Sequence, residues 1–145
     1  MSRRGPASNS DPNRSARGRR ANAAGLDAEA TAARLLETAG LEILAARYRT
    51  PHGEIDIVAR EGNTLVFVEV KARKTLDDAA QAISQRQWAR LEAAAIYAHS
   101  VYHTDTKLTQ TGPWSALPEM RFDVVLVSHD GTAERIINAR RFDEW

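Results

Sequence analysis

The sequence predicts an α/β protein of the α+β type, with a mixed β-sheet flanked by helices in the order α-β-β-β-α-β-β. Two segments carry apolar residues at helical spacing, and five shorter apolar segments are typical of strands. The predicted strands mostly stand together along the chain and do not alternate with helices. This arrangement implies one mixed sheet with helices packed on it.

The first helix is predicted to start near Asp27, which can cap it, and to end at Gly40. Its apolar residues at helical spacing are Leu26, Ala30, Ala33, Leu35, Leu36 and Ala39. Three strands are expected next, at residues 41–49, 54–60 and 64–73. Turn residues at 61–63 separate the last two, which predicts a hairpin.

A long alanine-rich helix is predicted over residues 78–100, with one apolar stripe formed by Ile83, Leu91, Ala94, Ala95 and Ala98. Residues 103–119 contain glycine and prolines and are expected to form a loop that is longer than usual. The last two strands are expected at residues 121–128 and 133–138.

The composition separates a basic N-terminal tail from one folded domain. Residues 1–24 hold six arginines and one acid with almost no large apolar residue, so we expect a disordered tail that could bind phosphate backbones or only aid solubility. Residues 25–145 are expected to form the domain. The chain has no cysteine, which excludes disulfides and cysteine-ligated zinc, and no long apolar run. A cytoplasmic protein without a membrane segment is therefore expected.

The predicted hairpin is the most informative segment. If Gly62 and Asn63 form a two-residue turn, Asp56 faces Glu69 and Glu54 faces Lys71 across the two strands. Two carboxylates then lie side by side among apolar neighbours, which is unfavourable unless their charge is compensated. A slip of one residue in the register would move the two acids to different faces.

Three forms of compensation remain open for this pair. One acid can take a proton, Lys71 can neutralise one acid, or a divalent cation can bridge them. Hard cations such as Mg²⁺ or Mn²⁺ prefer carboxylate and carbonyl oxygens, and Asp56, Glu69 and the Val70 carbonyl offer both. A metal, two acids and a lysine suit phosphodiester hydrolysis. The alternative is a structural salt-bridge cluster on a half-exposed sheet.

The sequence also resembles a known family at these residues. The run Gly53-Glu54-Ile55-Asp56, followed by Phe67-Val68-Glu69-Val70-Lys71-Ala72-Arg73, is similar to the YraN-like family of the restriction-endonuclease-like superfamily. The resemblance extends from Gly25 to about Asn138 and includes Glu29, the Gly40 turn and the segment 121–125.

The resemblance implies a restriction-endonuclease-like fold, with Asp56 and Glu69 as metal ligands and Lys71 as the catalytic lysine. Glu29 would correspond to the acid on the first helix that completes the site in Holliday-junction-resolvase-like members; alternatively, it complements the helix dipole. Gln85 is a further candidate near the site. The implied activity is a metal-dependent endonuclease acting on structured or branched DNA. Analogy with nucleases of branched DNA, which are often dimers, adds a homodimer to the expected partners.

The main alternative is a protein that keeps the nuclease fold and binds nucleic acid, or acts as an adaptor, without catalysis. Arg49 or Arg73 are the arginines expected beside the site. A structural hydrogen-bonding role is expected for Asp123, packing for Trp88, an anchoring role for Trp114 in the loop, and a solvated position for His52.

Overall fold

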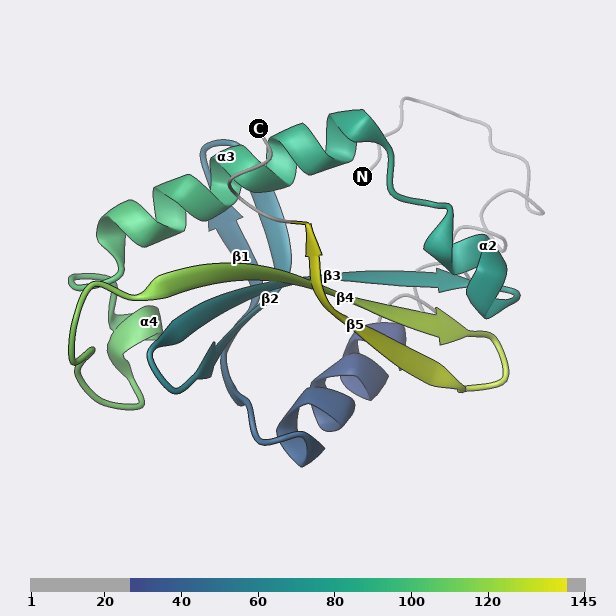
Figure 1. The fold of residues 1–145 in the computed structure, drawn as a ribbon, viewed down its shortest axis with the longest axis horizontal. Helices are drawn as coiled ribbons and strands as arrows, with labels where there is room; N and C mark the ends of the chain where they lie inside the picture. The colour runs from purple at the N-terminus through teal and green to yellow at the C-terminus, as the bar shows by residue number, and fades with distance from the viewer. Residues whose placement is uncertain (1–26, 141–145) are drawn as a thin grey trace, which may run out of the picture.

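A computed structural model describes residues 27–140 of the chain, in which helices cover both faces of one five-stranded sheet (Figure 1). The predicted tail, residues 1–24, lies outside the described residues. The strands are β1 (Glu42–Thr50), β2 (Gly53–Glu61), β3 (Thr64–Arg73), β4 (Glu119–Ser128) and β5 (Ala133–Arg140). They lie in sequence order, with β3 and β4 parallel and the other neighbours antiparallel. This is the predicted mixed sheet, and the arrangement is consistent with a restriction-endonuclease-like fold.

The helix over residues 27–38 covers one face of the sheet. Its buried positions are Ala28, Ala32 and Leu36, spaced four residues apart, and they pack with residues of β2, β3 and β4 such as Val66. Ala30 and Ala39 are exposed, so the predicted apolar stripe was wrong at these two positions. Gly40 follows the helix with a φ of 97°, which glycine adopts without strain, and confirms the predicted end.

The other face is covered by α3 (Gln85–Val101), with the predicted residues Leu91, Ala94, Ala95 and Ala98 buried against it. The prediction of one helix over residues 78–100 was wrong, because a short helix, α2 (Leu76–Ala80), precedes α3. Ser84 explains the break. Its hydroxyl accepts the Gln87 backbone N–H while the Gln87 side chain accepts the Ser84 N–H, a capping box that starts a new helix there.

The segment between α3 and β4 is more ordered than the predicted loop. It contains the short helix α4 (Thr106–Thr109), capped by Asp105, and it buries Leu108 in the core. The Trp114 indole N–H donates to the Leu108 carbonyl, and the Arg60 guanidinium lies 3.8 Å above the Trp114 ring. These contacts confirm the anchoring role expected for Trp114 in this segment. None of the helices within residues 27–140 is both long and apolar enough to span a membrane.

Candidate active site

The β2–β3 hairpin positions the candidate site. Its register is the predicted one, from Glu61 opposite Thr64 to Ile57 opposite Val68. Gly62 opens the two-residue turn with a φ of 61°. Beyond Ile57 the backbone pairing of the two strands stops, and an Asp56 carboxylate oxygen accepts the Val70 backbone N–H at 2.8 Å. Where the two strands separate, the Asp56 carboxylate therefore replaces a backbone carbonyl as the acceptor for the Val70 N–H, and this hydrogen bond holds Asp56 against β3.

Glu69 and Lys71 follow on β3 and share one face of the sheet because they are two residues apart. The Lys71 Nζ lies 3.4 Å from a Glu69 carboxylate oxygen, and the two side chains are only 13% and 8% exposed. Besides burial, the negative charge of Asp56 raises the pKa of Glu69, so the two carboxyl groups lie close enough to interact. The structure therefore brings Asp56, Glu69 and Lys71 together, as the sequence predicts.

The charge of this cluster is only partly balanced. Burial and, next, the negative charge of Asp56 raise the pKa of Glu69 from 4.5 to about 7, although the Lys71 ammonium acts in the opposite direction. One ammonium faces two carboxylates in a place that water scarcely reaches. An additional cation at this point would lower the cost of ionising both acids.

Glu29 reaches the same region from the helix over residues 27–38. Its carboxylate accepts a hydrogen bond of 3.1 Å from the Arg47 Nε on β1. Burial and the nearby charges of Asp56 and Glu54 raise the pKa of Glu29, while the Arg47 contact opposes this rise. Glu29 is therefore near Asp56, as the resemblance implies, and its direct partner is an arginine.

Arg47 was not expected at the site, since the sequence analysis favoured Arg49 or Arg73. Arg47 has a φ of 53°, which is uncommon for a residue with a side chain and costs about 1–2 kcal/mol. Its neighbours pair as Ala46 with Ile57 and Tyr48 with Ile55, so Arg47 stands opposite Asp56. Continuing the hairpin register from β2 into β1 would have predicted this position.

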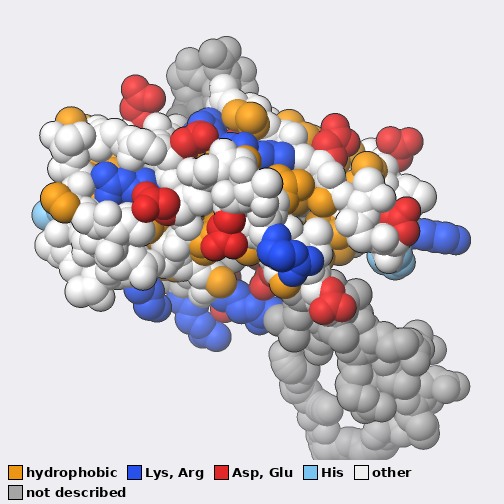
Figure 2. All heavy atoms as spheres, turned by 90° about the horizontal axis from the view of Figure 1, so that it is seen from below, with side chains coloured by type: hydrophobic (Ala, Val, Ile, Leu, Met, Phe, Trp, Pro, Cys, Tyr) orange, Lys and Arg blue, Asp and Glu red, His pale blue; other side chains and the backbone are white. Residues whose placement is uncertain are grey.

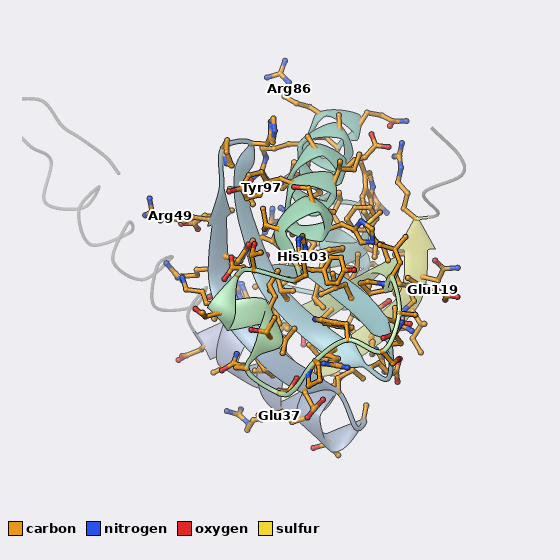
Figure 3. All side chains as sticks on the ribbon, turned by 90° about the vertical axis from the view of Figure 1, so that its left-hand side faces the viewer. Glu37, Arg49, Arg86, Tyr97, His103 and Glu119 are labelled. Atoms are coloured by element: carbon orange, nitrogen blue, oxygen red, sulfur yellow. The ribbon has the colours of Figure 1, made fainter. Side chains whose placement is uncertain are left out.

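The two arginines that were favoured occupy other places. Arg49 pairs with Glu54 at 3.3 Å and projects outward from the edge of the sheet (Figure 3). Arg73 is exposed and donates to the carbonyl of its neighbour Ala72. The predicted pairing of Glu54 with Lys71 was wrong, because the pairing of β2 with β3 stops at Ile57, and Glu54 has Arg49 as its ion-pair partner.

Within residues 27–140, Gln85 makes no contact with the acidic residues of the candidate site. It is exposed at the first position of α3, and its side-chain oxygen accepts a hydrogen bond of 3.2 Å from Arg140 on β5. The neighbouring Arg86 projects away from the end of α3 (Figure 3). His52 is exposed, as expected, and Trp88 packs edge-on against Phe122.

The donor set can be compared with the needs of a metal ion. Within residues 27–140, no group of three or more His, Cys, Asp and Glu side chains is arranged to hold a metal. A cation here would therefore depend on two carboxylates, from Asp56 and Glu69, a backbone carbonyl such as that of Val70, and water. Mg²⁺ is commonly held by one or two carboxylates with several waters, whereas zinc sites use nitrogen and sulfur ligands. The residues fit a hard cation such as Mg²⁺ or Mn²⁺.

A second buried acid, Asp123 on β4, has a different environment. Both of its carboxylate oxygens accept hydrogen bonds from Arg121, one also accepts from Arg135 and the other from the Asn138 backbone N–H. Burial tends to raise the pKa of Asp123, but the contacts with Arg121, Asn138 and Arg135 outweigh it, and the pKa is lowered. These contacts confirm the structural role expected for Asp123.

Comparison with known proteins adds the family. Residues 28–127 match the model of the "Uncharacterised protein family UPF0102". The chain is 47% identical over 115 residues to a UPF0102 protein of Bradyrhizobium sp. (strain BTAi1), covering 79% of this chain and 77% of that protein. It is 44% identical over 131 residues to a UPF0102 protein of Granulibacter bethesdensis, covering 88% of this chain and 75% of that protein. Both alignments are long enough to include the β2–β3 hairpin and the helices on either side of it.

Proposed function

Because the chain belongs to the UPF0102 family, whose name states no activity, its chemistry must be inferred from its own residues, and we propose that it is a metal-dependent endonuclease that hydrolyses phosphodiester bonds. The proposed substrate is structured or branched DNA. The observation that carries this proposal is the cluster at the β2–β3 hairpin, where Asp56 and Glu69 lie together with Lys71 and little water.

The proposed roles follow from the position of each group. Asp56 and Glu69, with the Val70 carbonyl, would hold a Mg²⁺ or Mn²⁺ ion, and the Val70 N–H keeps Asp56 turned towards β3. A divalent cation supplies positive charge to the phosphate and lowers the pKa of a water molecule. Lys71, whose stem is largely buried, can orient the attacking water or stabilise negative charge on the phosphate.

The substrate class depends on Glu29 and on the charge of the surface. The resemblance implies that Glu29 corresponds to the first-helix acid of Holliday-junction-resolvase-like proteins, and this correspondence supports a branched DNA substrate. Figure 2 shows Lys and Arg side chains gathered along one edge of the face that carries the helix over residues 27–38. Such an edge can follow a phosphate backbone. Two copies of the chain could act on two strands of one junction, as the expected homodimer suggests.

Cleavage assays test the proposal directly. The full chain is incubated with a DNA four-way junction, a linear duplex and a single strand, with Mg²⁺, with Mn²⁺ and with a chelator. We expect metal-dependent cleavage of the junction that is lost in Asp56→Ala, Glu69→Ala and Lys71→Ala, because each removes a metal ligand or the lysine. Glu37→Ala, an exposed position remote from the cluster, is the matched control for contaminating nucleases (Figure 3). Absence of cleavage of all three substrates by the unmodified chain would reject the proposal.

Thermal melts test the metal site without requiring activity. If Mg²⁺ binds the folded chain and not the unfolded chain, it stabilises the fold by about 1.4 kcal/mol at a concentration ten times its Kd. We expect the melting temperature of the unmodified chain to rise with Mg²⁺ above neutral pH and that of Asp56→Asn to stay constant. Asp56→Asn keeps an oxygen that can accept the Val70 N–H but removes one negative charge. An equal response of the two proteins to Mg²⁺ would contradict a site at Asp56.

A non-catalytic nucleic-acid-binding or adaptor protein is the second candidate. The observation that favours it is the small number of acidic ligands, since the described part of the chain holds no group of three or more His, Cys, Asp or Glu side chains that could bind a metal. In that case, DNA binding should fall with salt and should be unchanged in Asp56→Ala and Glu69→Ala, with no cleavage by any form.

A further inference from the structure

The start of β2 shows an unusually close contact with α3. Gly53 has a φ of 125°, and a Cβ built on it would lie 2.8 Å from the Nη1, 3.1 Å from the Cδ and 3.3 Å from the Cγ of Arg90. Three atoms of one arginine therefore occupy the space where any other residue would carry a side chain. The Arg90 side chain therefore packs against Gly53 at the start of β2, where the positive φ also favours glycine.

The Arg90 guanidinium has no ion-pair partner within residues 27–140. Within residues 27–140, the acidic side chains near the hairpin pair with other cations: Glu29 with Arg47, Glu54 with Arg49, and Glu69 with Lys71. Arg90 is exposed to solvent, and no acidic side chain in this range lies within ion-pair distance of it. An exposed arginine whose charge no acidic side chain compensates is available to bind a phosphate.

This guanidinium lies on the same face of the sheet as the candidate site. Phe67 of β3 packs with Leu91 of α3, and Glu69 and Lys71 continue the same face of β3 at two-residue spacing. Gly53 precedes Asp56 by three residues on β2, a separation of about 10 Å along an extended strand. At the axial rise of about 3.4 Å per nucleotide in B-DNA, this separation is a few nucleotides.

We propose that Arg90, positioned by Gly53, binds a backbone phosphate of the nucleic acid a few nucleotides from the bond that is cut at Asp56, Glu69 and Lys71. This inference rests on the proposed function and names a positioning residue for the same site. Arginine suits the role because its planar guanidinium can form two parallel hydrogen bonds to phosphate oxygens.

The salt dependence of DNA binding tests this contact. A labelled duplex is titrated with the full chain in the presence of a chelator at several salt concentrations. The measured quantity is the slope of the logarithm of the binding constant against the logarithm of the salt concentration. Arg90→Met keeps the long side chain along Gly53 but removes the charge, so the slope should become less steep by about 0.9. Arg90→Lys should keep most of the slope. Lys107→Met, which removes an exposed cation on α4 that has no role in the proposed site, is the matched control and should bind as the unmodified chain does.

The outcomes separate this inference from the nuclease proposal. Cleavage that depends on Asp56, combined with a slope for Arg90→Met equal to that of the unmodified chain, would overturn the Arg90 contact and leave the nuclease proposal standing. An equal loss in Arg90→Met and Lys107→Met would also overturn it, since it would show a diffuse charge effect. We expect the slope to be reduced only in Arg90→Met, and we expect this variant to cleave DNA with a raised KM and a little-changed kcat. Absence of DNA binding by the unmodified chain would overturn the contact.

Discussion

Asp123 and Glu69 are buried acids on neighbouring strands, with side chains 0% and 8% exposed. The charge of the groups around them differs. Asp123 is surrounded by two guanidinium groups and a backbone N–H, and its pKa is lowered. Glu69 has one ammonium, that of Lys71, and a second carboxylate, that of Asp56, beside it, and its pKa is raised.

The chain supplies the counter-charge of Asp123 itself, but it does not fully supply that of the acids at the candidate site. The Asp123 cluster is neutralised by residues of β4 and β5, so it needs nothing from outside the protein and has a structural role. The Asp56–Glu69–Lys71 cluster keeps an excess of negative charge in a poorly hydrated place. An acidic site of this kind is costly for stability and is suited to binding a cation.

The largest expected effect comes from removing the acid of the balanced cluster. Asp123→Ala leaves Arg121 and Arg135, which are 20% and 11% exposed, with Glu61 as their remaining acidic partner within residues 27–140. Breaking a buried pair in this way should lower the free energy of unfolding by about 3 kcal/mol. Urea denaturation measures the change, with Glu37→Ala as an exposed control. A loss smaller than about 1 kcal/mol would show that Glu61 suffices for both arginines.

A change of opposite sign is expected in the unbalanced cluster. The folded chain holds the Glu69 proton more tightly than the unfolded chain, since the pKa is raised from 4.5 to about 7. Between these values the folded state binds more protons, so this group makes the free energy of unfolding fall as the pH rises through that window. Below the window, where Glu69 is protonated in both states, the destabilisation is absent.

Glu69→Gln should therefore raise the free energy of unfolding by about 1–2 kcal/mol above neutral pH in a chelator, and by little at acidic pH. Glutamine can donate a hydrogen bond to Asp56 and carries no charge. Denaturation curves across this pH range, with Glu37→Gln as the control, measure the effect. A destabilisation by Glu69→Gln above neutral pH would indicate that the salt bridge with Lys71 outweighs the repulsion, as in a purely structural cluster.

The smallest expected effect on stability concerns Arg47. In Arg47→Asn, asparagine tolerates the positive φ better than arginine, but the ion pair with Glu29 is lost, and in that pair the Arg47 side chain is half exposed. Because these two effects oppose each other, the free energy of unfolding should change by less than about 1 kcal/mol. The informative measurement is the pKa of Glu29, followed by NMR titration. It should rise further, because the Arg47 hydrogen bond holds it down.

Arg49→Asn is the matched control for this change, since Arg49 lies two residues away on the same strand and pairs with Glu54. It should leave the pKa of Glu29 close to its value in the unmodified chain. An unchanged Glu29 pKa in Arg47→Asn would mean that Arg47 has no part in setting the charge at the site.

The hairpin and, with it, the centre of the candidate site could be predicted from the amino-acid sequence alone. A two-residue turn at Gly62 and Asn63 leaves one register, and the two-residue periodicity of strands then brings Asp56, Glu69 and Lys71 together. The mixed sheet and its helices could be predicted for the same reason, because apolar spacing depends on neighbours close in the chain. The break between α2 and α3 was missed because Ser84 and Gln87 lie inside an otherwise continuous helical pattern.

The residues from distant elements that meet at this hairpin could not be predicted, because packing of the whole domain selects them. Arg47 reaches Glu29 because the helix over residues 27–38 packs across the sheet, and Gln85 is bound to Arg140 because β5 ends beside the start of α3. The placement of Arg90 on Gly53 likewise depends on how α3 crosses β2. Side-chain contacts between elements follow from packing of the whole core, and no short-range pattern in the sequence encodes them.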